Sequence, residues 1–211
     1  GSWDETKLQA LQEAVGAMER NVRDLQERIM SVRMMPVASL FSRFPRLVRD
    51  TAAVCGKQVK LELSGTETEL DKSVIEQLGD PLTHLLRNAV DHGLETPEAR
   101  VAAGKPAQGT VHLGAAHEAG NVIIEVSDDG GGLDVARIRA KAVERGLIAA
   151  DATLADDEVH HLIFAPGFST AAVVSEVSGR GVGMDVVKRN IEALGGTVSI
   201  RSVPGEGTRF R

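Results

Sequence analysis

The N-terminal part of the chain repeats apolar side chains at alternating intervals of three and four positions. The series consists of Leu8, Leu11, Val15, Met18, Val22, Leu25, Ile29 and Val32. On an α-helix these intervals place every member on one narrow stripe, as in the a and d positions of a coiled coil. The pattern therefore predicts one long helix whose stripe needs a partner helix. It favours self-association through residues 4–35, and the alternative is that the helix packs on its own domain.

The pattern changes at Pro36, which interrupts the heptads. A second helical stretch is predicted over residues 37–54, because Pro45 is suited to restart a helix and Gly56 to end one. Beyond Gly56 apolar residues alternate with polar ones, which predicts a strand over residues 59–63.

The remaining sequence mixes short helices and strands. A helix is predicted from Asp80, an N-cap residue followed by Pro81, to Gly93, and the stretch up to Gly109 carries no predicted element. Further helices are predicted at 134–145, at 156–164 and before Gly195-Gly196, and further strands at 110–117, 121–127, 197–202 and 208–211. The first two of these strands are separated by Glu118-Ala119-Gly120 and predict a hairpin. Hairpins mixed with helices indicate a two-layer α+β fold.

Composition narrows the possible functions. The chain has 211 residues, a net charge of −6 and 3% aromatic residues. An acidic chain lacks the basic face that nucleic acid requires, so we expect no nucleic-acid partner. The single cysteine, Cys55, excludes an internal disulfide and is typical of a cytoplasmic protein. No apolar run approaches the roughly 20 residues of a membrane span, so we expect no membrane insertion.

Polar residues that could bind a ligand or a metal lie on one face of the predicted helix 80–92. His84, Asn88 and Asp91 share that face, and leucines occupy the opposite one. An asparagine amide oxygen is a hard neutral ligand, which suits Mg²⁺ with a shell of water and phosphate oxygens. The alternative is an ordinary solvated face, because every amphipathic helix has one.

Two glycine clusters add to this face. Residues 128–132 (Asp-Asp-Gly-Gly-Gly) follow an apolar strand, so a carboxylate and close backbone approach to a flat ligand are combined there. Residues 179–183 (Gly-Arg-Gly-Val-Gly) precede a helix, whose first N–H groups can bind an anion. Alone, the first could be a turn beside a strand and the second a flexible connector.

In this order, several segments resemble the CheA family of chemotaxis histidine kinases, in the GHKL superfamily. They comprise residues 84–93, 128–132, 164–170, 178–187 and 205–208, with a similar lead-in at 33–36 and 43–50. The resemblance implies a Bergerat-type two-layer α/β sandwich with a mixed sheet, preceded by a long N-terminal helix. It also implies two regions: 1–35 as part of a dimerisation helix hairpin, and 36–211 as the ATP-binding catalytic domain.

The resemblance further implies roles for individual residues. Asn88 would hold Mg²⁺ with His84 beside the metal, Asp128 would bind the adenine amine, and Lys141 would approach the phosphates. His84, Asn88 and Lys141 are thus the implied catalytic residues. The implied nucleotide-binding set comprises Asn88, Asp91, His92, Asp128, Gly130, Gly132, Leu133, Ile138, Lys141, Ser169, Thr170, Gly179, Arg180, Gly181, Val182, Gly183, Met184 and Thr208, where Ser169, Thr170 and 179–184 form a lid. Gly131 and Ala171 depart from the family, whose members often carry Arg or Lys at the first position and some carry Lys at the second.

The function implied is transfer of the γ-phosphoryl group of Mg-ATP to a histidine of a separate phosphotransfer domain. No histidine precedes His84, so the dimerising helix carries no acceptor. Response regulators and a receptor-coupling protein are expected to bind through domains outside this chain. One alternative is a related ATPase or serine kinase of the superfamily; these commonly have Glu four residues before the metal-binding Asn, where this chain has His84. The other alternative is a signalling scaffold that binds nucleotide without turnover.

Overall fold

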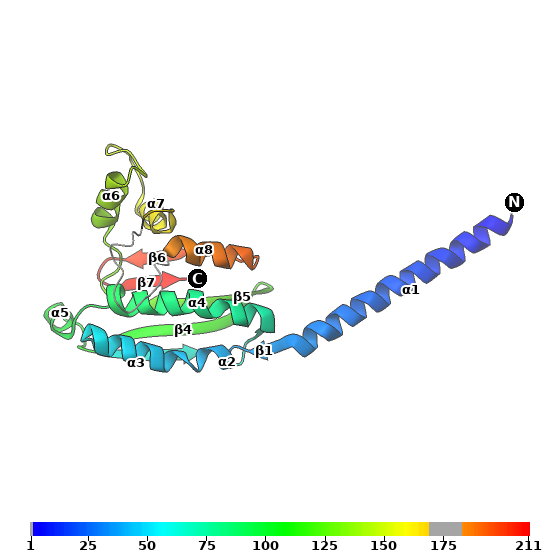
Figure 1. The fold of residues 1–211 in the computed structure, drawn as a ribbon, viewed down its shortest axis with the longest axis horizontal. Coiled ribbons are helices and arrows are strands. Elements are labelled where there is room, and N and C mark those ends of the chain that lie inside the picture. Colours follow the sequence, from blue (N-terminus) through cyan, green and yellow to red (C-terminus); the bar gives the residue numbers. More distant parts are fainter. Residues whose placement is uncertain (1, 169–182) are drawn as a thin grey trace.

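Helix α1 (Ser2–Arg33) extends away from the rest of the chain as a long rod (Figure 1). The structure is a computed structural model that describes residues 2–168 and 183–211. The apolar stripe of α1 is 47–85% exposed from Leu8 to Val32, and the apolar core of the described residues begins only after this helix. The helix therefore does not pack on its own domain in this structure.

A small two-stranded sheet joins α1 to the domain. Strand β1 (Met34–Pro36) pairs antiparallel with β3 (Glu69–Asp71). Next come α2 (Ala38–Phe41) and α3 (Phe44–Cys55), so the predicted single stretch 37–54 is two helices with a break before the proline. Gly56 ends α3 with φ of +65°, a conformation that glycine adopts without steric cost.

The main sheet has the order β2-β4-β5-β7-β6. Its strands are β2 (Val59–Ser64), β4 (Gly109–Glu118), β5 (Asn121–Asp128), β7 (Gly207–Phe210) and β6 (Ile200–Val203). β2 and β4 are parallel and the other neighbours are antiparallel, which confirms the predicted mixed sheet. The hairpin between β4 and β5 turns through Ala119 and Gly120, both with positive φ, as in a type I′ turn.

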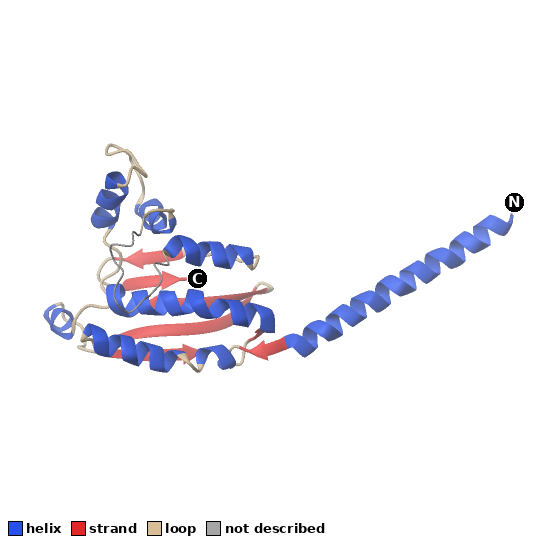
Figure 2. Ribbon diagram, in the orientation of Figure 1, coloured by secondary structure: helices blue, strands red, loops and turns tan. Residues whose placement is uncertain are grey.

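Helices cover one face of this sheet (Figure 2). They are α3, α4 (Lys72–Asn88) and α8 (Met184–Ala193). Inward-facing residues such as Val111, Leu113 and Val126 are at most 2% exposed beneath them. Alternate residues lie on the opposite face, where Glu125 pairs with Arg209 at 3.4 Å. The predicted two-layer α+β architecture is confirmed.

Helix α4 begins earlier than the sequence indicated. The prediction of a start at Asp80-Pro81 is wrong: Asp71 is the N-cap, its carboxylate accepts the N–H of Ser73 at 2.8 Å, and Pro81 lies inside the helix. Proline removes one helical hydrogen bond, but buried residues on both sides of it, such as Ile75 and Leu82, continue one apolar face. Burial of this apolar face therefore keeps the helix continuous through Pro81, although Asp80-Pro81 is a typical helix start.

The end of α4 widens into a π-turn, η1 (Ala89–Gly93), in which the N–H of Leu94 reaches the carbonyl of Ala89 at 2.8 Å. A short helix that the sequence did not predict, α5 (Pro97–Ala102), follows. The prediction of an element-free segment up to Gly109 is therefore wrong.

The last predicted elements agree with the structure, apart from one boundary. Helices α6 (Val135–Glu144), α7 (Asp156–His161) and the 3₁₀ turn η2 (Leu162–Phe164) occupy the predicted ranges. Strand β6 begins at Ile200 and not at residue 197, although Ser199 still exchanges backbone hydrogen bonds with Arg211.

The position of the N-cap can be tested by a pair of substitutions. We expect Asp71→Ala to lower the melting temperature by about 2–4 °C, because it removes the capping acceptor of α4. The matched change Asp80→Ala should leave it unchanged or raise it slightly, since residue 80 is an exposed position in the helix interior. Thermal unfolding followed by circular dichroism checks both, and a larger loss for Asp80→Ala would contradict this helix start.

Candidate functional site

The carboxylate of Asp128 lies at the C-terminal end of β5, the central strand of the sheet. On its two sides Asp128 pairs with Val111 of β4 and Thr208 of β7. One carboxylate oxygen, Oδ1, accepts the N–H of Gly130 at 2.9 Å. The strand thus ends in a carboxylate that is held by the loop which follows it.

Glycines from three segments make close approach to Asp128 possible. A Cβ at Gly93 would lie 2.7 Å from Asp128 Oδ2, and one at Gly130 would lie 1.9 Å from the carbonyl oxygen of Gly93. At Gly207, with φ of +126°, a Cβ would lie 1.9 Å from the carbonyl oxygen of Asp128. In contrast, a Cβ at Gly131 would have no neighbour closer than 3.9 Å. Close packing therefore requires the first three glycines and leaves the fourth position open.

Burial raises the pKa of Asp128 to about 6. This value already includes the negative charges of Asp129 and Glu95, which contribute to the rise, and the backbone N–H groups of Gly130 and Thr208, which limit it. Burial of an ionised carboxylate does not stabilise the fold. A carboxyl group with a pKa raised in this way is therefore a candidate functional group.

Hydroxyl groups connect the neighbouring strands to the loop. Ser202 Oγ of β6 accepts the N–H of Leu133 at 2.8 Å and lies 3.0 Å from Thr208 Oγ1. Gly132, with φ of +75°, is also packed tightly, since a Cβ there would lie 2.6 Å from the carbonyl oxygen of Val203. The structure thus brings Gly132, Leu133 and Thr208 together with Asp128, as the resemblance implied. Ser202 was missed, because an isolated serine in a strand carries no sequence signal.

Asn88 lies at the end of α4, facing the start of α8. Its Nδ2 donates to Met184 Sδ at 3.3 Å, and Gly183 is the N-cap of α8 without a side-chain cap. Within the described residues no hydrogen bond to Asn88 Oδ1 is recorded, so this hard oxygen can serve as a ligand. The first N–H groups of α8 lie at the same end of that helix, and such groups favour anions.

His84 is one turn earlier on α4 and half-buried. Burial lowers the pKa of its imidazole, and the nearby charges of Arg87 and His92 lower it further. The ring is therefore neutral at pH 7 and can offer a lone pair.

Asp91 and His92 lie on the π-turn. Asp91 accepts the thiol of Cys55 in α3 at 3.6 Å, and its other oxygen lies 3.5 Å from His92 Nε2. Among the described residues no contact between Asp91 and Asn88 is recorded. The expectation of one shared polar face rested on a regular helix, and the π-turn changes the direction of the residues that follow Asn88.

Two predicted site residues belong to α6. Ile138 is buried in the core, and Lys141 places Nζ 4.8 Å from the centroid of the Phe168 ring. Ser169, Thr170, Gly179, Arg180, Gly181 and Val182 lie outside the described residues.

Comparisons with known proteins show the family to which the chain belongs. Residues 75–211 match the family described as "Histidine kinase-, DNA gyrase B-, and HSP90-like ATPase". The chemotaxis protein CheA of Salmonella typhimurium (strain LT2) is 60% identical over 198 residues, which cover 94% of this chain and 29% of that protein. CheA of Klebsiella aerogenes is 56% identical over 211 residues, which cover 100% of this chain and 32% of that protein. The chain thus spans less than one third of the length of either relative.

Among solved structures, the catalytic domain of the histidine kinase ThkA aligns with a TM-score of 0.49 at 14% identity. That alignment covers 84% of this chain and 90% of that domain. No helix in the described part of the chain has both the length and the apolar character needed to cross a bilayer.

Replacement of the buried carboxylate should stabilise the free protein. We expect Asp128→Asn to raise the free energy of unfolding at pH 7 by roughly 1–3 kcal/mol, because the raised pKa means that the ionised form is the less favourable one in the fold. As the pH falls from 7 through 6 towards 4, wild-type Asp128 takes up a proton in the fold and the advantage of the variant disappears. Urea denaturation at pH 7 and pH 4.5 measures this, and an unfolding free energy lower than wild type at pH 7 would contradict it.

The glycine packing can be tested at two adjacent positions. Gly130→Ala should lower the free energy of unfolding by about 1–3 kcal/mol, because the methyl group collides with backbone. Gly131→Ala is the matched control and should stay within about 0.5 kcal/mol of wild type, since space is open there. Equal losses in urea denaturation would show that the loop is packed differently.

Proposed function

The chain belongs to the histidine kinase-, DNA gyrase B- and HSP90-like ATPase family, and from this we propose that it is the catalytic region of a chemotaxis histidine kinase. It binds Mg-ATP and transfers the γ-phosphoryl group to a histidine on a separate phosphotransfer domain. The observation that carries the proposal is the buried Asp128 carboxylate among the glycines of three segments. Residues 36–211 are proposed as the catalytic domain and residues 1–35 as part of a dimerisation unit.

The adenine base is proposed to bind at Asp128. The exocyclic amine of adenine is a hydrogen-bond donor, and the ionised carboxylate is its acceptor. Gly130 and Gly132 let the flat base approach the backbone, and the buried hydroxyl of Thr208 lies on the adjacent strand. Leu133 and Ile138 supply apolar contact beside the base. The adenine amine would supply a hydrogen bond that replaces the solvation lost by the buried carboxylate. Nucleotide binding therefore offsets the free-energy cost of burying this charge in the free protein.

Magnesium is proposed to bind at Asn88. Among residues 2–168 and 183–211 no group of three or more His, Cys, Asp or Glu side chains can hold a metal. A neutral amide oxygen fits a Mg²⁺ ion that takes its other ligands from water and phosphate. The imidazole of His84 is proposed to lie beside the metal and the terminal phosphate. When bound, the ion neutralises charge that develops on the phosphates.

The phosphates are proposed to extend from Asp128 towards the N-terminus of α8. The N–H groups that follow Gly183 favour an anion there. Lys141 and His92 are proposed to approach the phosphates, and Asp91 lies 3.5 Å from His92 Nε2. The lid residues Ser169, Thr170 and 179–182 belong to the same proposal. Catalysis then consists of positioning and charge neutralisation.

The phosphoryl acceptor is proposed to be a histidine outside this chain. His84 stands four residues before Asn88, so that position has no carboxylate to activate water or a hydroxyl group. This disfavours a superfamily ATPase or serine kinase. Response regulators and a receptor-coupling protein are the further partners, and the proposed location is the cytoplasm, where ATP and a reduced Cys55 are expected.

A homodimer is proposed through α1. Its stripe of eight apolar side chains is at least 47% exposed along the whole rod, and burial against a second copy of the stripe would remove this surface from water.

The proposed reaction can be tested with labelled ATP. Wild-type chain should incorporate label into a separately supplied phosphotransfer domain, and Asn88→Ala should weaken Mg-dependent ATP binding at least tenfold by loss of the metal ligand. Gln77→Ala, an exposed position on the same helix, is the control and should behave as wild type. Transfer assays and calorimetry with and without Mg²⁺ provide the measurements. Unchanged affinity of Asn88→Ala would refute the metal role, and tight binding by wild type without transfer would favour the scaffold.

The dimer can be tested by sedimentation. Leu11→Asp/Val22→Asp should shift the chain from dimer to monomer, because both changes add charge to the stripe. Gln9→Asp/Ala10→Asp adds the same charge outside the stripe and should leave the dimer intact. Wild-type chain that sediments as a monomer at tens of micromolar would contradict the proposal.

A further inference from the structure

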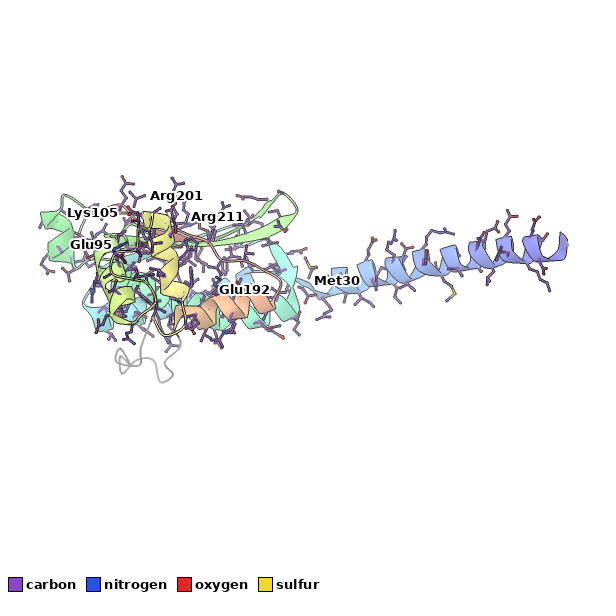
Figure 3. All side chains as sticks on the ribbon, turned by 90° about the horizontal axis from the view of Figure 1, so that it is seen from above. Met30, Glu95, Lys105, Glu192, Arg201 and Arg211 are labelled. Carbon is purple, nitrogen blue, oxygen red and sulfur yellow. The ribbon has the colours of Figure 1, made fainter. Side chains whose placement is uncertain are left out.

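Four ionised side chains form a compact cluster behind the Asp128 loop. The cluster consists of Glu95, Arg100, Lys105 and Asp129. It lies at the end of the molecule opposite α1, where Figure 3 shows Glu95 and Lys105 side by side. Glu95, Arg100 and Lys105 fall in the segment where no element was predicted, and no sequence motif pointed to a role for them.

Arg100 is the centre of this cluster and is only 1% exposed. Its guanidinium donates to Glu95 Oε1 at 3.1 Å, to the Asp129 carbonyl oxygen and carboxylate, each at 3.1 Å, and to the carbonyl of Pro106 at 2.7 Å. A buried arginine is tolerated only when its donors are paired in this way. The side chain therefore ties α5 to the residue that follows Asp128.

Lys105 completes the attachment of the loop. Its Nζ donates to Glu95 Oε2 at 2.8 Å, to the Asp129 carbonyl at 3.1 Å and to the Gly130 carbonyl at 2.8 Å. Asp129 Oδ1 in turn accepts the N–H of Thr110 in β4 at 2.8 Å. Two successive carbonyls after Asp128 are thus directed into the cluster.

The charge balance of the cluster also affects Asp128. Its two cations pair with the carboxylates of Glu95 and Asp129, and the negative charges of these two carboxylates still raise the pKa of the buried Asp128. Stability alone does not explain such a cluster, since apolar residues often replace buried ion pairs without loss of stability. What the cluster supplies is a fixed direction for the loop backbone.

We propose that Arg100 and Lys105 are positioning residues that hold the Asp128 loop in the geometry that selects adenine over guanine. This inference rests on the proposed function. Adenine presents an amine donor where guanine presents a carbonyl acceptor, so a carboxylate aimed at that position attracts the first base and repels the second. Once the loop is released from the cluster, the carboxylate can turn away and the discrimination is reduced.

The test compares base selectivity in full-length chains. Arg100→Met and Lys105→Met remove the charged groups and keep most of the aliphatic part of each side chain. Arg100→Lys keeps the positive charge but lacks the planar guanidinium group. Calorimetry gives the Kd for Mg-ATP and Mg-GTP, and denaturation gives the stability of each variant. Leu40→Ala, a buried change in α2 (4% exposed), serves as the control for destabilisation alone.

We expect the ratio of the GTP Kd to the ATP Kd to fall at least tenfold in both methionine variants, mainly through weaker ATP binding, and to recover partly in Arg100→Lys. Leu40→Ala should lose stability and keep the wild-type ratio.

A ratio within twofold of wild type in both methionine variants would overturn the inference. If Arg100→Met does not fold, Lys105→Met decides alone, because its site is 20% exposed and tolerates the change. A wild-type chain that binds no Mg-ATP would overturn the proposed function together with this inference, whereas variants that retain wild-type preference would overturn only the latter.

Discussion

The carboxylate of Asp128 lies at the end of the central strand, where burial raises its pKa to about 6 and three separate segments approach it through glycine. These segments are the π-turn at the end of α4, the loop after β5 and the turn between β6 and β7. Each brings backbone to a distance that a side chain would prevent. The desolvated charge destabilises the free fold, and the proposed ligand, which supplies a hydrogen-bond donor there, would account for its presence.

The architecture places this carboxylate beside the other proposed ligand groups. β5 is the middle strand of the sheet, and its end meets the turn that closes α4. Asn88 directly precedes that π-turn and faces the start of α8. The proposed base and metal sites therefore both lie at the end of one helix, and the ion cluster of Glu95, Arg100, Lys105 and Asp129 contacts the loop after Asp128.

Much of the fold follows from the sequence pattern, because local signals and burial agree there. Alternating residues identify β2, and the Ala119-Gly120 turn closes the predicted hairpin of β4 and β5. The start of α4 was mistaken because Asp80-Pro81 is a strong local signal, whereas the buried apolar face begins at Ile75 and continues across that signal. Helix α5 was missed because its main anchor, Arg100, is charged and depends on partners that are distant in sequence.

The candidate site was predictable to a similar degree. Asp128, Gly130 and Thr208 come together as expected because their segments carry recognisable glycine patterns. Asp91 accepts the thiol of Cys55, a contact that a helical wheel cannot anticipate, because the wheel treats residues 89–93 as a regular α-helix. The contribution of Gly93 became visible only from its 2.7 Å approach to Asp128, which depends on the packing of two elements.

The most direct test of this account is an NMR titration of the Asp128 side-chain carbonyl carbon in the free chain and in the presence of saturating Mg-ATP. The account predicts a pKa near 6 in the free chain and a lower pKa with nucleotide, because the adenine amine stabilises the ionised carboxylate. An ordinary aspartate pKa of about 4 that does not change when nucleotide is added would contradict it.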